Sequence, residues 1–271
     1  MTDKKRVFNA RFALVITLIL LVASAAGCAA PGVSQAAGAP AYIVIEAESG
    51  RVIAEERADA KMYPASTTKI LTALVVLERM PLELEFTVPD CAVGVEGSSI
   101  YLRRGEKVSV GDMLYGLMLR SGNDAAVALA VATAGSVERF AAMMNERARR
   151  AGAASSNFVN PHGLHDDGHY TTARDLALIT AEAYRHPEFA RIVATKKVTT
   201  GEGENARVMY NKNKLLSSLE GANGVKTGYT TRSGKCLVGG AIVDGVQRIS
   251  VLLGASGDMW SVTRELLMRK V

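Results

Sequence analysis

The chain has 271 residues and a formal net charge of +5 at pH 7, and 22% of its residues are charged. This length suits one large domain or two small ones, and the composition excludes a disordered or low-complexity protein. Residues 1–28 hold four basic residues and one acidic residue, a balance of +3, which leaves +2 for the rest of the chain. The charges outside the leader are therefore nearly balanced, and the chain has no basic stripe interleaved with aromatic residues. Both features argue against nucleic-acid binding.

Residues 1–28 have the pattern of a secretory signal, with a basic start, an apolar run over 12–22 and then small residues. The run is shorter than the roughly 20 residues of a transmembrane helix. Two cleavage sites compete: Ala23-Ser24-Ala25 fits signal peptidase, and Ala25-Ala26-Gly27-Cys28 resembles a bacterial lipobox without its usual Leu, in which Cys28 would be lipidated. An uncleaved signal anchor is a third alternative. Each alternative predicts a protein that works outside the cytoplasm.

Residues 29–40 consist of Ala, Gly, Pro, Ser and Gln with one Val, and we expect a flexible tether there. One folded domain is expected over 41–271. Cys91 and Cys236 fall in this domain, where two buried thiols are the favoured state and a disulfide between them stays open. No cysteine spacing fits a zinc site.

The domain opens with a predicted β-hairpin, in which strand patterns at 42–46 and 51–55 flank the turn Glu48-Ser49-Gly50. An apolar run over 70–77 follows. Helix-start residues precede this run, and it is apolar almost all round. We therefore expect a buried central helix that begins near Ser66.

The remaining elements follow from their periodicity. Helices are predicted over 109–118, 125–134, 137–150, 171–184 and 260–268, and strands over 86–88, 107–110, 224–229, 236–243 and 248–254. The longer strands lie near the two chain ends, with most helices between them. This order predicts an α/β fold whose antiparallel sheet is built from both chain ends, with an all-helical insertion.

Ser66 and Lys69 form an S-x-x-K pattern at the start of the first predicted helix. Residues three apart on a helix are neighbours, so the amine can reach the hydroxyl. A serine hydroxyl becomes a nucleophile when a base takes its proton, and a lysine kept neutral by burial and nearby positive charge can be that base. A helix cap beside a solvated lysine is the simpler alternative, and the pattern alone does not exclude it.

Two later motifs favour the chemical interpretation. Ser121-Gly122-Asn123 lies in a turn between two buried helices, where side chains can point into a cleft, although a plain helix–helix turn also explains it. Lys226-Thr227-Gly228 lies on a predicted strand, where Lys226 and Thr227 can hold a carboxylate and Gly228 lets a substrate backbone approach. The amide of Tyr229 can then pair with the amide of Ser66 as an oxyanion hole.

His162, His165 and His169 lie close together in a turn-rich loop. Their spacing matches no helical or hairpin metal site. We therefore expect histidines that bind nearby backbone groups, and no metal.

In this order, S-x-x-K, S-x-N and K-T-G are the motif set of penicillin-binding proteins and class A β-lactamases. The chain resembles the low-molecular-weight penicillin-binding proteins that are serine-type D-alanyl-D-alanine carboxypeptidases, and the resemblance implies a β-lactamase/transpeptidase-like fold. It covers roughly residues 40–271. The motifs that carry it are Tyr63–Lys69, Gly97–Ser99, Ser121–Ala126, Asn160–Leu164, Thr172–Asp175 and Gly224–Thr230.

The resemblance implies a role for each matching residue. Ser66 is the nucleophile that forms an acyl-enzyme, Lys69 is its proton acceptor, and Ser121 relays a proton to the leaving D-alanine. Asn123 orients the substrate, and Lys226 with Thr227 binds its terminal carboxylate. The family removes the last D-alanine from peptidoglycan stem pentapeptides during cell-wall biogenesis, contributes to cell shape, is acylated by β-lactams, and needs no metal or other cofactor.

Many family members carry a further C-terminal β-domain and an anchoring helix. Because this chain stops at Val271, we expect neither of them here. A lipidated Cys28 or an uncleaved leader would then hold the protein on the outer face of the cytoplasmic membrane.

Other functions stay open at this point. A class A β-lactamase prefers S-D-N and uses a loop glutamate for deacylation, but residues 151–175 contain no glutamate. A D,D-endopeptidase would use the same residues as a carboxypeptidase. A sensor that binds muropeptides or antibiotics, with or without acylation, is a further alternative, although a pure binder would not need Ser66 and Lys69 together. For any of the enzymes, activity is expected to rise with pH on the alkaline side of neutral, as Lys69 loses its proton.

Overall fold

The computed structural model describes residues 40–270. The predicted signal over 1–28, the lipidation of Cys28 and nearly all of the predicted tether lie outside the described residues.

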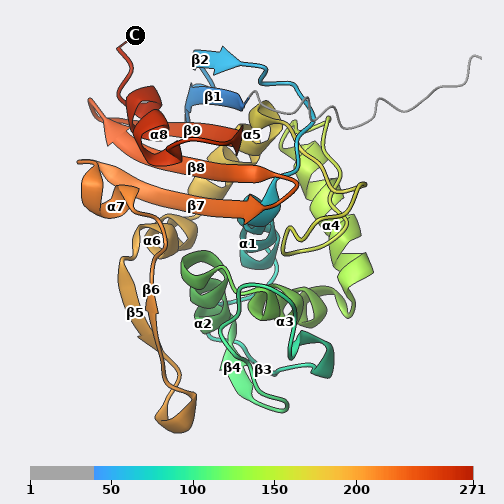
Figure 1. The fold of residues 1–271 in the computed structure, drawn as a ribbon. Helices are drawn as coiled ribbons and strands as arrows, with labels where there is room; N and C mark the ends of the chain where they lie inside the picture. The colour runs from blue at the N-terminus through green and yellow to red at the C-terminus, as the bar shows by residue number, and fades with distance from the viewer. Residues whose placement is uncertain (1–39, 271) are drawn as a thin grey trace, which may run out of the picture. The chain divides into compact units, whose positions relative to one another are not determined.

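Five strands form one antiparallel sheet in the order β2-β1-β9-β8-β7. Their bounds are Ala41–Glu46 for β1, Val52–Glu56 for β2, Ala222–Thr230 for β7, Gly234–Val243 for β8 and Val246–Ala255 for β9. β1 pairs with β9, with Tyr42 opposite Leu252, so strands from the two ends of the chain lie side by side (Figure 1). The predicted sheet is therefore confirmed.

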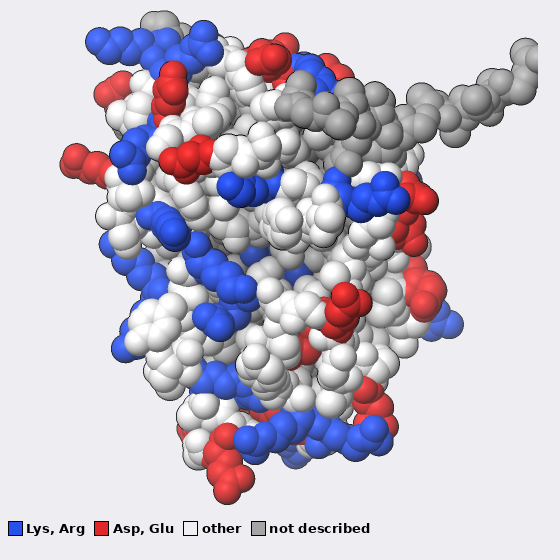
Figure 2. Space-filling view, viewed as in Figure 1, with Lys and Arg blue, Asp and Glu red and all other residues white. Residues whose placement is uncertain are grey.

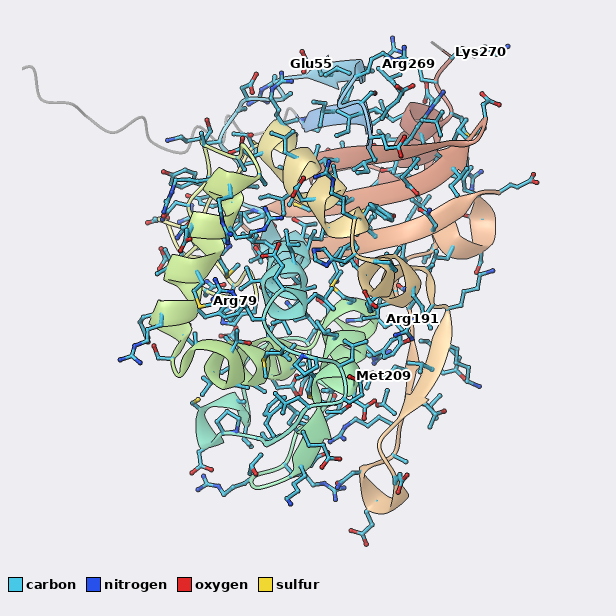
Figure 3. The ribbon with its side chains drawn as sticks, turned by 180° about the vertical axis from the view of Figure 1, so that it is seen from behind. Glu55, Arg79, Arg191, Met209, Arg269 and Lys270 are labelled. Carbon is cyan, nitrogen blue, oxygen red and sulfur yellow. The ribbon has the colours of Figure 1, made fainter. Side chains whose placement is uncertain are left out.

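Both faces of the sheet are covered at its centre. The runs 236–241 on β8 and 248–253 on β9 are buried without interruption, as expected for strands enclosed on both sides. α8 (Met259–Leu267) packs against β8 and β9 on one face (Figure 1). Seen from behind, α5 (Ala173–Tyr184) crosses the other face (Figure 3).

α1 (Lys69–Leu77) is the central helix of the helical region. Residues 69–76 are all buried, which explains why the run is apolar on every side. A 3-10 turn over Ala65–Thr68 leads into α1, so Ser66 lies just before the α-helix proper. The neighbours of α1 are α3 (Asn123–Ala134), α4 (Val137–Arg150), α5 and α6 (Pro187–Ala194).

The segments on either side of α1 differ from the prediction in two places. α2 (Val110–Tyr115) continues as a π-turn over Gly116–Arg120, beside the short pair β3 (Glu85–Thr87) and β4 (Lys107–Ser109). No element was assigned to residues 187–218 from the sequence. They form α6, β5 (Lys197–Thr200), β6 (Arg207–Tyr210) and α7 (Leu215–Ser218), and β5 and β6 pair as a ribbon along one side of the helical region (Figure 1).

Two arginines join segments that lie far apart in the sequence. Arg147 of α4 is 6% exposed, and it donates to Glu78 after α1 at 2.7 Å and to Glu182 of α5 at 2.8 Å. Arg207 of β6 donates to both carboxylate oxygens of Glu106, at 2.6 and 2.8 Å. Each ion pair thus fixes one helix or strand to another.

Cys91 and Cys236 are free thiols, of which only Cys236 is buried. The expectation of two buried thiols was therefore wrong for Cys91. This residue lies in a short surface turn over Asp90–Ala92, where only Ala92 points inward. Within residues 40–270 no single helix has the length and hydropathy to cross a membrane. The helices α3 and α4 have that length and hydropathy only when they are taken together, and the pair is bent by 85°.

Candidate active site

Ser66 and Lys69 meet as their spacing predicts. The turn over Ala65–Thr68 places the Ser66 hydroxyl Oγ 3.1 Å from the Lys69 amine Nζ. The amine is completely buried, and its other two contacts are the side-chain oxygen of Asn123 and the backbone oxygen of His162, each at 2.7 Å. All three of these acceptors are uncharged, so no carboxylate in the described chain neutralises Lys69 directly.

The surroundings of Lys69 favour the neutral amine. Burial lowers its pKa well below the ordinary value, because a charge loses its hydration there. The positive charges of Lys226 and Lys212 lower the pKa further, and Asp124 acts weakly in the opposite sense. The result is an amine that can accept a proton at its lone pair, at hydrogen-bond distance from a serine hydroxyl.

The turn that carries Ser121 and Asn123 lies against this amine. Ser121 has left-handed backbone angles, φ 64° and ψ 30°, which end the π-turn and redirect the chain into α3. Such angles cost a non-glycine residue free energy and persist where the surroundings hold them. Ser121 and Asn123 are 4% and 3% exposed, and Ser121 lines the cleft described below. The segment is therefore a helix–helix turn that also contributes a side chain to a cleft, as predicted.

Asp124 holds a crossing segment, residues 96–102, over this turn. Its carboxylate accepts from the Ser99 hydroxyl at 2.6 Å and from the backbone amides of Ile100 and Leu102. The side-chain amide of Asn123 also donates to the backbone oxygen of Glu96 at 2.6 Å. The N-cap position of α3 is Gly122, and the Asp124 carboxylate also accepts from the Ala125 amide in the first turn of the helix, at 2.9 Å.

β7 forms the opposite wall of the site and is an edge strand of the sheet. Lys226 is 1% exposed and donates to the backbone oxygen of Thr227 at 3.0 Å. Burial, with help from Lys212, lowers the pKa of Lys226 to about 7. A side chain at Gly228 would begin 3.0 Å from the backbone nitrogen of Ser66, so only glycine lets the strand approach this closely.

Between these walls lies a cleft of about 340 Å³. Its lining includes five predicted positions, Ser66, Ser121, Thr227, Gly228 and Tyr229, together with Ser98, Lys212, Met259 and Trp260. Basic side chains gather across the middle of the face that Figure 2 shows. The arrangement brings together a hydroxyl that can act as a nucleophile, an amine that can act as a base, a second hydroxyl and cations. Such a set of groups can transfer an acyl group from an anionic substrate.

Lys212 is a member of the cleft that the sequence analysis missed. Its amine donates to the Ser98 hydroxyl at 3.1 Å, across 114 positions of the chain. Burial and Arg120 lower its pKa, and its own charge lowers the pKa of both Lys69 and Lys226. No local motif marks it, because it follows the unpredicted ribbon of β5 and β6.

Two of the three loop histidines, His162 and His169, contact backbone groups as expected, whereas His165 lies 3.3 Å from a carboxylate oxygen of Asp167. His169 accepts from the amide of Val159 at 3.1 Å and lies 2.8 Å from the Thr68 hydroxyl, while His162 accepts from the amide of Leu164. Burial lowers their pKa values, to about 3 for His169 and about 4 for His162, so both rings are neutral. The described residues contain no group of side chains suited to a metal.

One motif of the resemblance does not reach the cleft. Thr172 caps α5 by accepting from the amide of Asp175, whose carboxylate binds Ser155 and Ser156. Arg174 pairs at the surface with Glu55 and Asp59. The motif Thr172–Asp175 therefore positions a helix rather than a reacting group.

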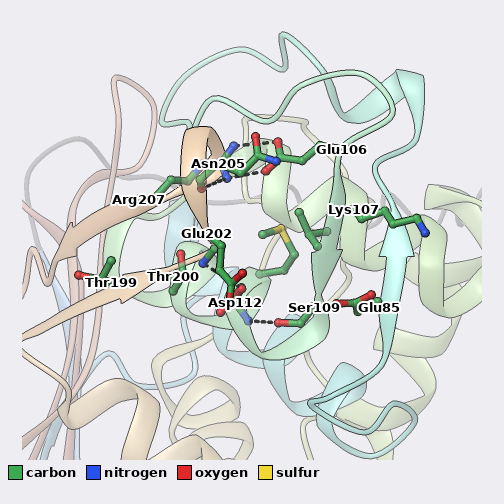
Figure 4. A pocket seen from close by; sticks show the side chains of 13 residues that line it. Glu85, Glu106, Lys107, Ser109, Asp112, Thr199, Thr200, Glu202, Asn205 and Arg207 are labelled. Atoms are coloured by element: carbon green, nitrogen blue, oxygen red, sulfur yellow. Dashed lines mark hydrogen bonds and ion pairs between the residues drawn. The ribbon is translucent and has the colours of Figure 1, made fainter.

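A second cavity, of about 470 Å³, lies away from this chemistry. It opens between the tip of the β5–β6 ribbon and the β3–β4 pair, and Figure 4 shows the Arg207–Glu106 ion pair at its edge. It shares no lining residue with the Ser66 cleft, and its most buried acid, Glu106, is already paired. The smaller cleft is therefore the candidate active site.

Comparison with known proteins identifies the family of the chain. A family model described as D-alanyl-D-alanine carboxypeptidase matches residues 28–257. The chain is 38% identical over 234 residues to the D-alanyl-D-alanine carboxypeptidase DacC of Escherichia coli (strain K12), covering 81% of this chain and 57% of the relative. It is 33% identical over 224 residues to DacF of Bacillus subtilis (strain 168), of the same description, covering 80% and 58%. The chain thus spans less than two thirds of the length of these curated relatives.

Solved structures extend the likeness to the fold. The D-alanyl-D-alanine carboxypeptidase DacD of Francisella tularensis matches with a TM-score of 0.78 at 28% identity, covering 84% of this chain and 69% of that chain. A mutant of the Streptomyces K15 DD-transpeptidase matches with a TM-score of 0.75 at 33% identity, covering 80% and 90%. The predicted β-lactamase/transpeptidase-like α/β fold is confirmed.

Proposed function

Because the chain belongs to the D-alanyl-D-alanine carboxypeptidase family, we propose that it is a serine D,D-carboxypeptidase that removes the terminal D-alanine from peptidoglycan stem pentapeptides. One observation carries the proposal: the buried Lys69 amine has only uncharged acceptors, and one of them is the Ser66 hydroxyl at 3.1 Å. A structural lysine would need a carboxylate in such a place.

The contacts of Lys69 support one direction of proton transfer. A neutral amine has two N–H bonds and one lone pair. The carbonyl oxygens of Asn123 and His162 can only accept, so they take the two N–H bonds. The lone pair is then left for the Ser66 hydroxyl. Ser66 Oγ attacks the carbonyl carbon of the penultimate D-alanine while its proton passes to Lys69 Nζ.

The amides of Ser66 and Tyr229 are the proposed oxyanion hole. The close approach of β7 at Gly228 brings the strand against the Ser66 nitrogen. As an edge strand, β7 can direct amides away from the sheet, toward a bound substrate. Both donors are backbone amides whose positions are fixed before the reaction begins. Such preorganised donors stabilise the developing oxyanion most strongly.

The leaving D-alanine lies on the Ser121 side of the cleft in this proposal. Ser121 returns a proton to its nitrogen as the peptide C–N bond breaks, and charged Lys226 with Thr227 holds its carboxylate. Water then attacks the acyl-enzyme, and Ser66 regains its proton. A β-lactam would acylate Ser66 by the same route. The absence of glutamate from residues 151–175 favours slow release of the penicilloyl group over β-lactamase turnover.

The cellular setting is part of the proposal. The substrate lies in the cell wall, so the enzyme works outside the cytoplasm and serves wall biogenesis and cell shape. Residues 1–28 would direct its export, and either Cys28 lipidation or an uncleaved leader would attach it to the membrane.

The test combines two reagents on the purified full-length protein. Benzylpenicillin is added first and then, separately, a pentapeptide ending in D-Ala-D-Ala, while intact mass and released D-alanine are followed. An adduct that maps to Ser66, together with D-alanine release, is the expected result. Ser66→Ala should abolish both signals, and Ser109→Ala, a helix-cap serine outside the cleft, should keep them.

Other outcomes assign other functions. An adduct without D-alanine release would replace the proposal by a sensor, or by an endopeptidase if a cross-linked muropeptide is cut instead. Rapid loss of the adduct as penicilloate would indicate a β-lactamase. No adduct at all would refute the role of Ser66.

A further inference from the structure

A charged cavity adjoins the cleft beyond Tyr229. It has a volume of about 420 Å³ and is lined by Glu96, Leu164, His165 and residues 229–232. Tyr229 is 66% exposed and borders both the cleft and this cavity. We call the cavity the Tyr229 side pocket. None of its residues is needed for the proton transfers proposed above, except through the amide of Tyr229.

Two opposite charges in the Tyr229 side pocket have no partner. Glu96 and Arg232 both line it, yet neither forms an ion pair with the other or with any residue in 40–270. His165, which also lines the pocket, lies 3.3 Å from a carboxylate oxygen of Asp167. An unpaired acid and an unpaired base on one cavity are complementary to a ligand that carries both an ammonium and a carboxylate.

Both charges stand on backbone that is held in place. The backbone oxygen of Glu96 accepts from the side-chain amide of Asn123 at 2.6 Å, which ties Glu96 to the active site. Arg232 lies in a turn closed by Thr230 and Ser233. The Thr230 amide donates to the Ser233 hydroxyl at 2.8 Å, and the Ser233 amide donates to the Thr230 hydroxyl at 3.0 Å. Because the backbone is already fixed, binding has to order only the two charged side chains and not the loop.

The direction of β7 places a definite part of the substrate at this pocket. In the proposed function, the terminal carboxylate lies at Lys226 and Thr227, and the scissile carbonyl lies at the Tyr229 amide. A peptide that adds to the edge strand in this direction runs antiparallel to β7, and each further residue advances about 3.3 Å. The residue before the two D-alanines therefore lies beside positions 230–232, where the side pocket opens.

We propose that the Tyr229 side pocket binds the third residue of the stem peptide, and that it selects a diamino dicarboxylic acid there. The side-chain ammonium of this residue pairs with Glu96, and its side-chain carboxylate pairs with Arg232. The inference rests on the proposed function, because it uses the same substrate and its direction along β7. It adds a preference between substrate classes that the reacting groups themselves do not determine.

The test compares three substrates that share the D-Ala-D-Ala end. One pentapeptide has meso-diaminopimelate as its third residue, one has L-lysine there, and diacetyl-L-Lys-D-Ala-D-Ala carries neither side-chain charge. Each contact is solvent-exposed, so about fivefold in kcat/KM is expected for each charge, with the diaminopimelate substrate best. The change should fall on KM, because the contacts exist in both the ground state and the transition state.

Two variants separate the contacts. Arg232→Gln should lower the ratio of kcat/KM for diaminopimelate over lysine from about five to about one. Glu96→Gln should lower the ratio of lysine over the diacetyl substrate by a similar factor. Arg79→Gln and Glu56→Gln, exposed residues away from the pocket, should leave all three rates unchanged (Arg79 is labelled in Figure 3).

The outcomes distinguish the two proposals. Hydrolysis of none of the three substrates would refute the carboxypeptidase function, and this inference with it. Equal kcat/KM on all three would leave the carboxypeptidase intact and overturn the side-pocket inference. The same result follows if the two charge-removing variants leave the ratios unchanged.

Discussion

Two cations are buried in the helical region, and the protein treats them in opposite ways. Arg147 of α4 is 6% exposed and contacts two carboxylates, those of Glu78 and Glu182. Lys69 of α1 is fully buried and contacts a hydroxyl and two carbonyl oxygens. Both positions remove a cation from water, which is costly unless the charge is paired or lost.

The difference follows from the chemistry of the two side chains. A guanidinium keeps its proton at any physiological pH, so a buried arginine stays charged, and at Arg147 two carboxylates offset that charge. A lysine can release its proton, and burial with neighbouring positive charge makes that release easier. Arg147 therefore holds helices together, whereas the surroundings of Lys69 prepare a base. A buried lysine without a carboxylate is the feature that distinguishes a reactive position from a structural one here.

Replacing Lys69 by alanine should give the largest effect. The base is lost, and we expect the rate of penicilloyl adduct formation to fall by about 10³-fold or more. Lys69→Arg should fall as far, because a guanidinium cannot accept the Ser66 proton. Adduct formation is followed by intact mass, and a thermal melt of each variant shows whether the fold is kept. If either folded variant is acylated near the wild-type rate, Lys69 is not the base, and its contrast with Arg147 has no catalytic meaning.

Replacing Arg147 by methionine should instead act on stability. It leaves Glu78 and Glu182 without their common partner, and we expect a loss of about 2–3 kcal/mol. This is less than the roughly 3–5 kcal/mol for breaking fully buried pairs, because the two carboxylates are partly exposed. Urea unfolding measures the loss, with Arg79→Met, an exposed neighbour of Glu78, as the control within about 0.5 kcal/mol. A stable Arg147→Met protein would show that the ion pairs contribute nothing net.

Replacing Lys226 by methionine should have a smaller effect of the opposite sign. Lys226 makes one hydrogen bond and no ion pair, so removing its buried charge should stabilise the fold by about 1 kcal/mol while weakening carboxylate binding. Its pKa is about 7 in the folded protein and near 10.5 when unfolded. The unfolded chain thus binds more protons between these values, and wild-type stability rises with pH there. The gain from Lys226→Met should be full below pH 7 and shrink towards pH 10.5. If the gain in stability does not depend on pH, it comes from better packing of methionine and not from removal of the charge.

The sequence was sufficient where the informative residues are close together in the chain. Ser66 and Lys69 are three apart, so helical spacing alone predicted their contact, and Lys226 to Tyr229 share one strand. An antiparallel sheet built from both chain ends followed from the strand patterns at those ends, although which strands pair did not. In each case one local pattern determines the geometry, and the tertiary structure has only to bring the pieces together.

The sequence was insufficient where long-range contacts determine the structure. The strands β5 and β6 have four residues each and largely exposed side chains, so their patterns were weak; the pair Arg207–Glu106 holds the ribbon across 101 positions. The carboxylate of Asp124 binds amides more than twenty residues before it. Lys212 enters the cleft only because the ribbon places it there, opposite Ser98. Charge pairing over such separations leaves no periodic signal in the sequence.

Lys212 gives the smallest and most specific prediction. Its positive charge lowers the pKa of Lys69. Lys212→Met should therefore raise that pKa, and the rising limb of the acylation rate against pH should move to higher pH. The sign is fixed, because Lys69 acts as a base only after it has lost its proton. The limb is read from penicilloyl adduct formation, whose plateau should change little if Lys212 acts through charge alone.

Lys212→Arg tests whether charge is the cause. It keeps the positive charge next to Ser98, so its rising limb should stay where the wild-type limb lies. Lys214→Met, two residues along and outside the cleft lining, should also leave the limb in place. If Lys212→Met lowers the plateau without moving the limb, Lys212 orients the substrate and has no part in keeping Lys69 neutral. In that case, burial and the charge of Lys226 would account for the low pKa of Lys69, and with it for the contrast with the ion-paired Arg147.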